Sequence, residues 1–225
     1  KSYNIQNAFD FIHLDKGWIR KNIGIVGEKI YLELNSVSCL EIDLVPSDKK
    51  SCCVSRSFSQ PLEKLSDLEK VISNYGSRAS EKIRSENLIA GSMNIFVLTN
   101  YFNKREKHYS NSIKLDLPYS TNNNFDIIKT ALKGLRKIYR NGFRYKKTGI
   151  ILHELSKINK VKKLFDYNIE TSNSVMNVMD EINTKYGIST LKIASEGINR
   201  KWEMKREKIS PCYTTRFEEI VKVRA

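Results

Sequence analysis

The sequence predicts an α+β protein whose central part, residues 51–155, has a ferredoxin-like β-α-β-β-α-β order of elements. Four short stretches of this part are rich in β-branched and aromatic residues, as strands are. Two longer stretches between them carry apolar residues at helical spacing. This order is typical of a four-stranded antiparallel sheet with both helices on one face, which leaves the other face free to meet a partner.

The first 36 residues predict short helices. Asp15 can cap a helix over about residues 16–23, and Gly24 can end it. A second helix follows, and its apolar stripe consists of Val26, Ile30 and Leu34. Because such short helices bury little apolar surface, and because the chain does not begin with Met, we expect a fragment whose first part packs on upstream sequence. Residues 37–50 are typical of an extended linker.

The elements of the central part follow in order. The predicted strands are Ser51–Phe58, Ile89–Thr99, a stretch around Ile113–Leu117, and Tyr145–Leu152. The first helix begins with a capping box, Ser66-x-x-Glu69, and carries an apolar stripe from Leu68 to Ile83. The second helix has its stripe between Ile128 and Tyr139, and we expect it to end at Asn141–Gly142.

The last third of the chain predicts a connector and a small domain. Residues 156–172 form the Lys-rich connector, and residues 173–225 predict a small α/β C-terminal domain. The helix of that domain should end at Gly187. We expect its stripe to lie in the core; the stripe consists of Val175, Val178, Met179 and Ile182. Leu191–Ala194 predicts a short strand.

The charge of the chain points to a polyanionic partner. There are 39 Lys and Arg residues against 25 Asp and Glu, which gives a net charge of +14. Residues 50–155 alone carry +10, against −1 before them and +5 after them. Such a surplus favours nucleic acid over a membrane surface. No apolar run approaches the roughly 18–20 residues of a membrane span, which excludes an integral membrane protein.

The motifs of common enzymes are absent from the sequence. It contains no phosphate-binding Gly-rich loop, no nucleophile elbow and no zinc-protease motif. Four cysteines without C-x-x-C spacing and three scattered histidines indicate no zinc site, and they fit a reducing, cytoplasmic setting. The carboxylates are scattered singly, so we expect no catalytic residue, no metal site and no cofactor in this chain.

Basic and hydroxyl side chains gather near the ends of the predicted strands. The candidate DNA-binding residues are Ser55, Arg56, Ser57, Lys104, Arg105, Lys114, Arg144, Lys146 and Lys147. Lys104 and Arg105 belong to a basic and aromatic loop between the two middle strands, which also contains Tyr101 and Phe102. Guanidinium, ammonium and hydroxyl groups donate readily to phosphates, so we expect contacts to a nucleic-acid backbone. The plain alternative is solvated charge that keeps the domain in solution.

Several segments of the sequence resemble one known family, in its order and over nearly the whole chain. They include CVSRSF, YGSRASEKIRSE and NGFRYKKTGIIL, which are similar to the little finger, or polymerase-associated, domain of UmuC-type Y-family DNA polymerases. GWIRKNIGIVGEKIYLELNSVSCLEID resembles the end of the thumb. VMNVMDEINTKYG and GINRKWEMKREKISPCYTTR resemble the small UmuC-specific C-terminal domain. The resemblance implies a thumb remnant at 1–36, a little finger at 51–155 and that C-terminal domain at 173–225.

The resemblance also implies a function for the parent protein. Family members copy DNA past damaged bases in the SOS response, with two Mg²⁺ ions held by palm carboxylates that would lie upstream of Lys1. This chain alone is then expected to grip the primer–template duplex through its backbone and to incorporate no nucleotide. A UmuD-like accessory subunit and a RecA filament are further partners that the resemblance implies.

A clamp-binding motif is expected just after the little finger. The family's form is Gln-Leu-x-Leu-Phe, and the matching place here reads Val161-Lys162-Lys163-Leu164-Phe165. Leu164 and Phe165 keep the apolar end of the motif, whereas a Lys at the first Leu position loses burial and weakens contact with a sliding clamp. The alternative is that these two side chains anchor the connector on the chain itself.

Two other functions stay open at the level of sequence. The chain could be a stand-alone nucleic-acid-binding module with a ferredoxin-like sheet, or an adaptor that binds proteins through its tail. An RNA-recognition sheet would carry the string Lys/Arg-Gly-Phe/Tyr-x-Phe/Tyr on a central strand, and no such string occurs. The adaptor role is compatible with a polymerase, and the sequence upstream of Lys1 would distinguish a polymerase from a stand-alone module.

Overall fold

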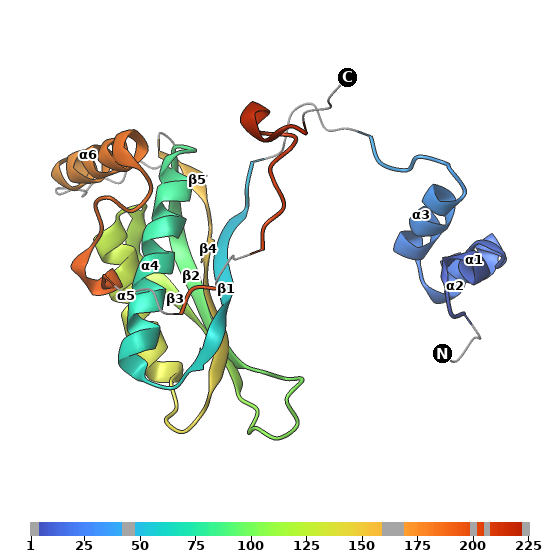
Figure 1. The fold of residues 1–225 in the computed structure, drawn as a ribbon, viewed down its shortest axis with the longest axis horizontal. Helices are drawn as coiled ribbons and strands as arrows, with labels where there is room; N and C mark the ends of the chain where they lie inside the picture. Colours follow the sequence, from blue (N-terminus) through green and yellow to red (C-terminus); the bar gives the residue numbers. More distant parts are fainter. Residues whose placement is uncertain (1–4, 42–47, 159–168, 199–201, 205–207, 222–225) are drawn as a thin grey trace. The chain divides into compact units, whose positions relative to one another are not determined.

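The computed structural model describes residues 5–41, 48–158, 169–198, 202–204 and 208–221. The chain divides into two compact units, Lys1–Asp48 and Lys49–Ala225. The first unit is helical, and the second contains the sheet (Figure 1).

The first unit has the short helices that the sequence predicts. They are α1 (Ala8–Ile12), α2 (Lys16–Asn22) and α3 (Ile25–Leu34). The Asp15 side chain accepts a hydrogen bond of 2.7 Å from a backbone N–H in the first turn of α2, so it caps that helix as predicted. Within this unit Ile19 is buried, whereas the apolar stripe of α3 is exposed.

The second unit is built on an antiparallel sheet. Its strands are β1 (Ser51–Leu62), β2 (Leu88–Thr99), β3 (Ser110–Thr121), β4 (Tyr145–His153) and β5 (Ser156–Lys157). The order in space is β1-β4-β2-β3, and β5 pairs with the start of β2. The α+β class and the β-α-β-β-α-β order predicted from the sequence are confirmed. β1 and β3 are the two edges, and β4 and β2 form the centre.

Two helices cover one face of this sheet (Figure 1). They are α4 (Leu65–Arg84) and α5 (Asn124–Ile138). The predicted stripe from Leu68 to Ile83 is buried, and it packs with Ile95 of β2 and Ile150 of β4 in the core. Because each fully buried side chain of this size contributes about 1.5–3 kcal/mol, this layer holds the helices on the sheet.

Both helices differ from the prediction at one end. α4 begins at Leu65 without a side-chain cap, so Ser66 lies inside the helix and the predicted capping box is wrong. The Glu69 carboxylate instead pairs with Arg136 of α5 at 2.7 Å. α5 ends at Ile138, shortly before the predicted stop, because the next residue adopts an extended conformation.

The residues after β5 pack on α4 in the same unit. α6 spans Ile169–Tyr186, and two short 3-10 helices span Ala194–Glu196 (η2) and Phe217–Glu219 (η3). The buried Glu196 carboxylate accepts hydrogen bonds from Asn74 at 2.8 Å and from Ser77 at 2.6 Å, both on α4. Arg84 of α4 donates two hydrogen bonds to Asp180 of α6, at 2.7 and 2.8 Å. These contacts tie the tail to the sheet unit.

Two predictions for the tail are corrected. Leu191–Ala194 is not a strand, because the Asn183 amide bonds both the N–H (2.8 Å) and the C=O (3.0 Å) of Leu191, which a partner strand would otherwise bond. Met179 is buried as predicted, but Val175 and Val178 are 56% and 54% exposed. The buried edge of α6 is therefore shifted from the predicted stripe.

Candidate nucleic-acid interface

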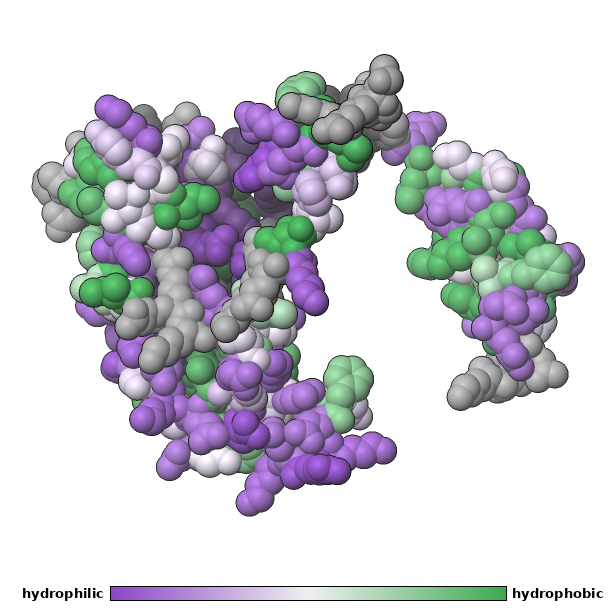
Figure 2. Space-filling model, in the orientation of Figure 1, coloured by the Kyte–Doolittle hydropathy of each residue, from purple (hydrophilic) through white to green (hydrophobic). Residues whose placement is uncertain are grey.

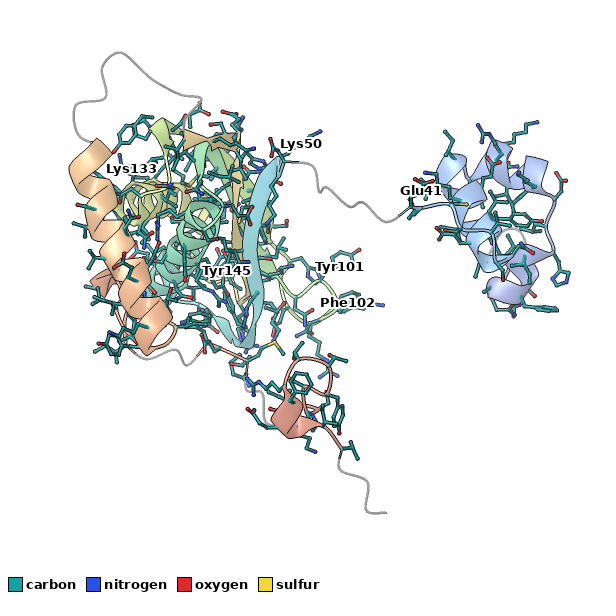
Figure 3. The ribbon with its side chains drawn as sticks, turned by 90° about the horizontal axis from the view of Figure 1, so that it is seen from above. Glu41, Lys50, Tyr101, Phe102, Lys133 and Tyr145 are labelled. Atoms are coloured by element: carbon teal, nitrogen blue, oxygen red, sulfur yellow. The ribbon has the colours of Figure 1, made fainter. Side chains whose placement is uncertain are left out.

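The face of the sheet opposite α4 and α5, here called the open face, can be assigned from the strand register. Side chains alternate between the two faces of a sheet. Because Ile95 and Ile150 point to the helices, the positions next to them point away. The open face includes Cys53, Ser55 and Ser57 of β1, Lys147, Gly149 and Ile151 of β4, Ser92, Asn94, Phe96 and Leu98 of β2, and Ser112, Lys114 and Asp116 of β3. Figure 3 shows the sheet from above, with α4 and α5 on one side of it.

Gly149 leaves room for an aromatic ring in the middle of the open face. This residue pairs with Ser55 on one side and with Phe96 on the other. A Cβ atom at Gly149 would lie 2.6 Å from Cζ of Phe96, so only glycine lets the ring lie across this point. Lys147 Nζ lies 6.0 Å from the centre of the same ring, at the outer limit of a cation–π contact. A phosphate could therefore approach hydroxyl groups and an ammonium group here.

The alternation separates three residues that are consecutive in the sequence. Ser55 and Ser57 point to the open face, whereas Arg56 points to the side that carries α4. The charge of Arg56 acts on buried Tyr75 of α4: burial raises the pKa of Tyr75 to about 12, and Arg56 opposes part of that rise. The structure thus places Arg56 at the exposed edge of β1, apart from the two serines.

Two of the predicted DNA-binding cations are held by partners within the chain. Lys146 Nζ donates hydrogen bonds to the backbone carbonyls of Phe58 at 2.6 Å and of Ser59 at 3.2 Å. Arg144 pairs with Glu63 at 3.2 Å and also with Glu106 of the β2–β3 loop. Both side chains therefore hold local structure, and their charge is less available to a ligand.

Lys114 on β3 lies on the open face but also has a carboxylate partner. Its Nζ is 3.1 Å from the carboxylate of Glu154, which accepts a second hydrogen bond from Ser92 at 2.9 Å. The hydrogen bonds from Lys114 and then Ser92 hold the pKa of Glu154 below its ordinary value. Because this pair is largely exposed, a phosphate could compete for Lys114.

The β2–β3 loop, residues 100–109, carries cations of a different kind. Lys104, Arg105 and Lys107 are exposed, and none of them pairs with a carboxylate among the described residues. The loop projects beyond the end of the sheet (Figure 1), and Figure 2 shows hydrophilic side chains gathered around that end. Six of the nine predicted site residues thus fall into two groups: Ser55, Ser57, Lys114 and Lys147 share the open face, and Lys104 and Arg105 lie on the loop. The structure brings Arg56, Arg144 and Lys146 into neither group.

Sequence reasoning missed Phe96, Gly149 and Ser112 as parts of the open face. A signal was present, because Gly149 stands inside a predicted strand, and such a glycine often marks close approach of another group. Alternation along β2 could also have placed Phe96 opposite the buried Ile95. What the sequence lacked was the pairing of β2 with β4, which brings Phe96 and Gly149 together.

Among the described residues, no group of three or more His, Cys, Asp or Glu side chains is placed to hold a metal ion. No helix in the same ranges is long and apolar enough to cross a membrane. The predicted clamp-binding residues, Leu164 and Phe165, lie outside the described residues.

Comparisons with known proteins agree with the arrangement of the chain. Residues 49–164 match the impB/mucB/samB family C-terminal domain, and residues 173–223 match a domain of unknown function, DUF4113. The chain is 34% identical to protein UmuC of Salmonella typhimurium over 223 residues, which cover 98% of this chain and 53% of that protein. It is 32% identical to protein ImpB of the same organism over 219 residues, or 96% of this chain and 51% of the relative.

A relative from another organism gives the same picture. Protein MucB of Escherichia coli is 32% identical over 218 residues, which cover 96% of this chain and 51% of MucB. The chain thus spans about half the length of the curated relatives it matches. The family match at residues 49–164 covers the sheet together with α4 and α5. The chain therefore belongs to the impB/mucB/samB family and is a C-terminal region of the UmuC type.

Proposed function

We propose that this chain is the DNA-binding region of a UmuC-like translesion polymerase and that it holds the backbone of a primer–template duplex. The observation that carries the proposal is the open face, where Ser55, Ser57 and Lys147 lie together. The β2–β3 loop adds cations that pair with no carboxylate in the described part of the chain. Net charge supports the proposal, because residues 50–155 carry +10.

Contact with the backbone, and little reading of base sequence, follows from the type of surface. The open face offers short hydroxyl side chains and flexible lysines, which suit phosphate oxygens. The helices α4 and α5, which could enter a major groove, are packed against the other face of the sheet. We therefore expect similar affinity for duplexes of different sequence.

The activity of the whole protein is part of the proposal. DNA synthesis past damaged bases would belong to a palm outside this chain, where carboxylates would hold Mg²⁺, so we expect no nucleotide incorporation by this chain alone. Its setting would be the cytoplasm, with a UmuD-like subunit, a RecA filament and a sliding clamp as partners. Contact with the clamp through Leu164 and Phe165 stays a prediction.

Salt titration of DNA binding tests the proposal. The purified chain should bind a blunt DNA duplex, and the plot of log K against log[salt] should have a slope of about −5 to −6, as about five to seven neutralised phosphates give. Fluorescence anisotropy between about 50 and 200 mM salt measures this slope. No binding at the low end of this range, or an affinity that salt does not change, would contradict the proposal.

A further inference from the structure

The tip of the β2–β3 loop exposes two neighbouring aromatic rings. Tyr101 is 79% exposed and Phe102 is 90% exposed. Figure 3 shows both side chains at the end of the loop, pointing away from the sheet. The two ring centres are 6.0 Å apart at 82°, and the His108 ring lies 5.7 Å from Tyr101. Exposed apolar surface that gathers in one place commonly marks a binding site.

Hydrogen bonds within the loop fix this arrangement. The backbone N–H of Phe102 donates to the Asn100 side chain at 3.1 Å, and that of Arg105 donates to the Asn103 side chain at 3.1 Å. At the base of the loop, the N–H of Thr99 donates to the carbonyl of Tyr109 at 3.0 Å. Since the turn already orders the backbone, a ligand that meets the rings loses less conformational entropy on binding.

The charge around the rings identifies the class of ligand. Lys104, Arg105 and Lys107 follow them in the same loop, are exposed, and have no carboxylate partner among the described residues. A single-stranded nucleic acid carries phosphates and flat base faces at short intervals, so it matches cations and rings at once. The bases of an intact duplex are already stacked on one another, and they offer no free face except at an end.

We propose that Tyr101 and Phe102 stack on unpaired bases of the DNA, while the cations of the loop hold the neighbouring phosphates. The inference rests on the proposed function, because the duplex on the open face would bring a single-stranded extension to the loop. The inference goes beyond the proposed function because it assigns the loop to the single-stranded extension of the DNA. The loop then distinguishes a primer–template with an overhang from a blunt duplex.

The test compares two DNA substrates and three variants. Affinity is measured for a blunt duplex and for the same duplex with a single-stranded overhang, with wild type, Phe102→Ala, Tyr101→Ala and the control Phe217→Ala. Phe217 of η3 is also 90% exposed but lies outside the loop. Each loop variant should weaken binding of the overhang substrate by about 5- to 150-fold, the effect of losing one stacked base, and leave the blunt duplex unchanged.

A second measurement reports stacking directly. Tyr101→Trp keeps a ring at the tip and should retain the preference for the overhang, and its fluorescence should be quenched by the overhang substrate and not by the blunt duplex. Equal losses of affinity on both substrates, or no loss on either, would overturn the inference. No loss on either substrate would indicate that the two rings bind a protein instead of DNA. If wild type binds neither DNA, the proposed function itself fails, which separates the two outcomes.

Discussion

Lys146 and Lys147 are adjacent on β4, yet the fold gives them different surroundings. Lys146 lies where the register of β4 shifts against both of its neighbouring strands, and the carbonyls of Phe58 and Ser59 accept its hydrogen bonds. Lys147 points to the open face, where Phe96 lies beneath it. A basic cluster in a sequence is therefore no site until the contacts of each side chain are known, because backbone carbonyls of the same chain can hold a cation.

Stability should show the largest difference between the faces. Ile150→Ala removes a fully buried side chain from the helix-covered face, and the free energy of unfolding should fall by about 2–5 kcal/mol. Ile151→Ala, one residue further on the open face, should lower it by about 1 kcal/mol or less. Urea unfolding followed by circular dichroism measures both. Equal losses would mean that the open face is covered by another part of the protein.

DNA affinity should depend more on the open face than on the side chains held within the chain. Lys147→Ala should weaken duplex binding by about 5- to 30-fold, and it should make the salt slope shallower by about 1, because one phosphate contact is lost. Lys146→Ala should lower the melting temperature through its lost carbonyl contacts and leave affinity nearly unchanged. Anisotropy titrations at several salt concentrations measure both variants. A larger effect at Lys146 than at Lys147 would contradict the proposal that the duplex lies on the open face.

Arg56 sharpens the same comparison. The sequence predicts that Arg56→Ala weakens DNA binding, and this stays a prediction. Since Arg56 lies at the β1 edge on the helix-covered side, we expect a smaller loss than for Lys147→Ala, measured in the same titrations. A loss as large as that of Lys147→Ala would show that the duplex extends around the β1 edge.

The smallest effect concerns an exposed ion pair on the open face. Lys114→Ala should raise the pKa of Glu154 toward its ordinary value, because the hydrogen bond from Lys114 is the first cause of its lowering. The lowered pKa stabilises the fold at neutral pH, and this contribution is lost as the pH falls through that pKa. Carboxyl NMR titration of both proteins measures the shift. If the pKa of Glu154 is unchanged in the variant, the hydrogen bond from Ser92 would be the main cause of its low value.

The fold was predictable from sequence to a large extent, and the site less so. The buried stripe of α4, the alternation on β3 and the cap at Asp15 depend on residues close together in the chain, and they are confirmed. The capping box at Ser66 failed because Glu69 pairs with Arg136, which is distant in sequence. The strand at Leu191 failed for a similar reason, since the Asn183 side chain takes its backbone bonds.

The sequence by itself determined the order of the elements, the apolar stripes of the core and the surplus of positive charge. Only the tertiary structure decided which charges stay available: Arg144 meets Glu63 and Glu106 from two other loops, whereas Lys147 meets an aromatic ring. The physical reason is the separation along the chain over which each interaction acts. Helical and strand periodicity act between near neighbours in the chain, but an ion pair forms between residues that only the folded backbone brings within about 4 Å.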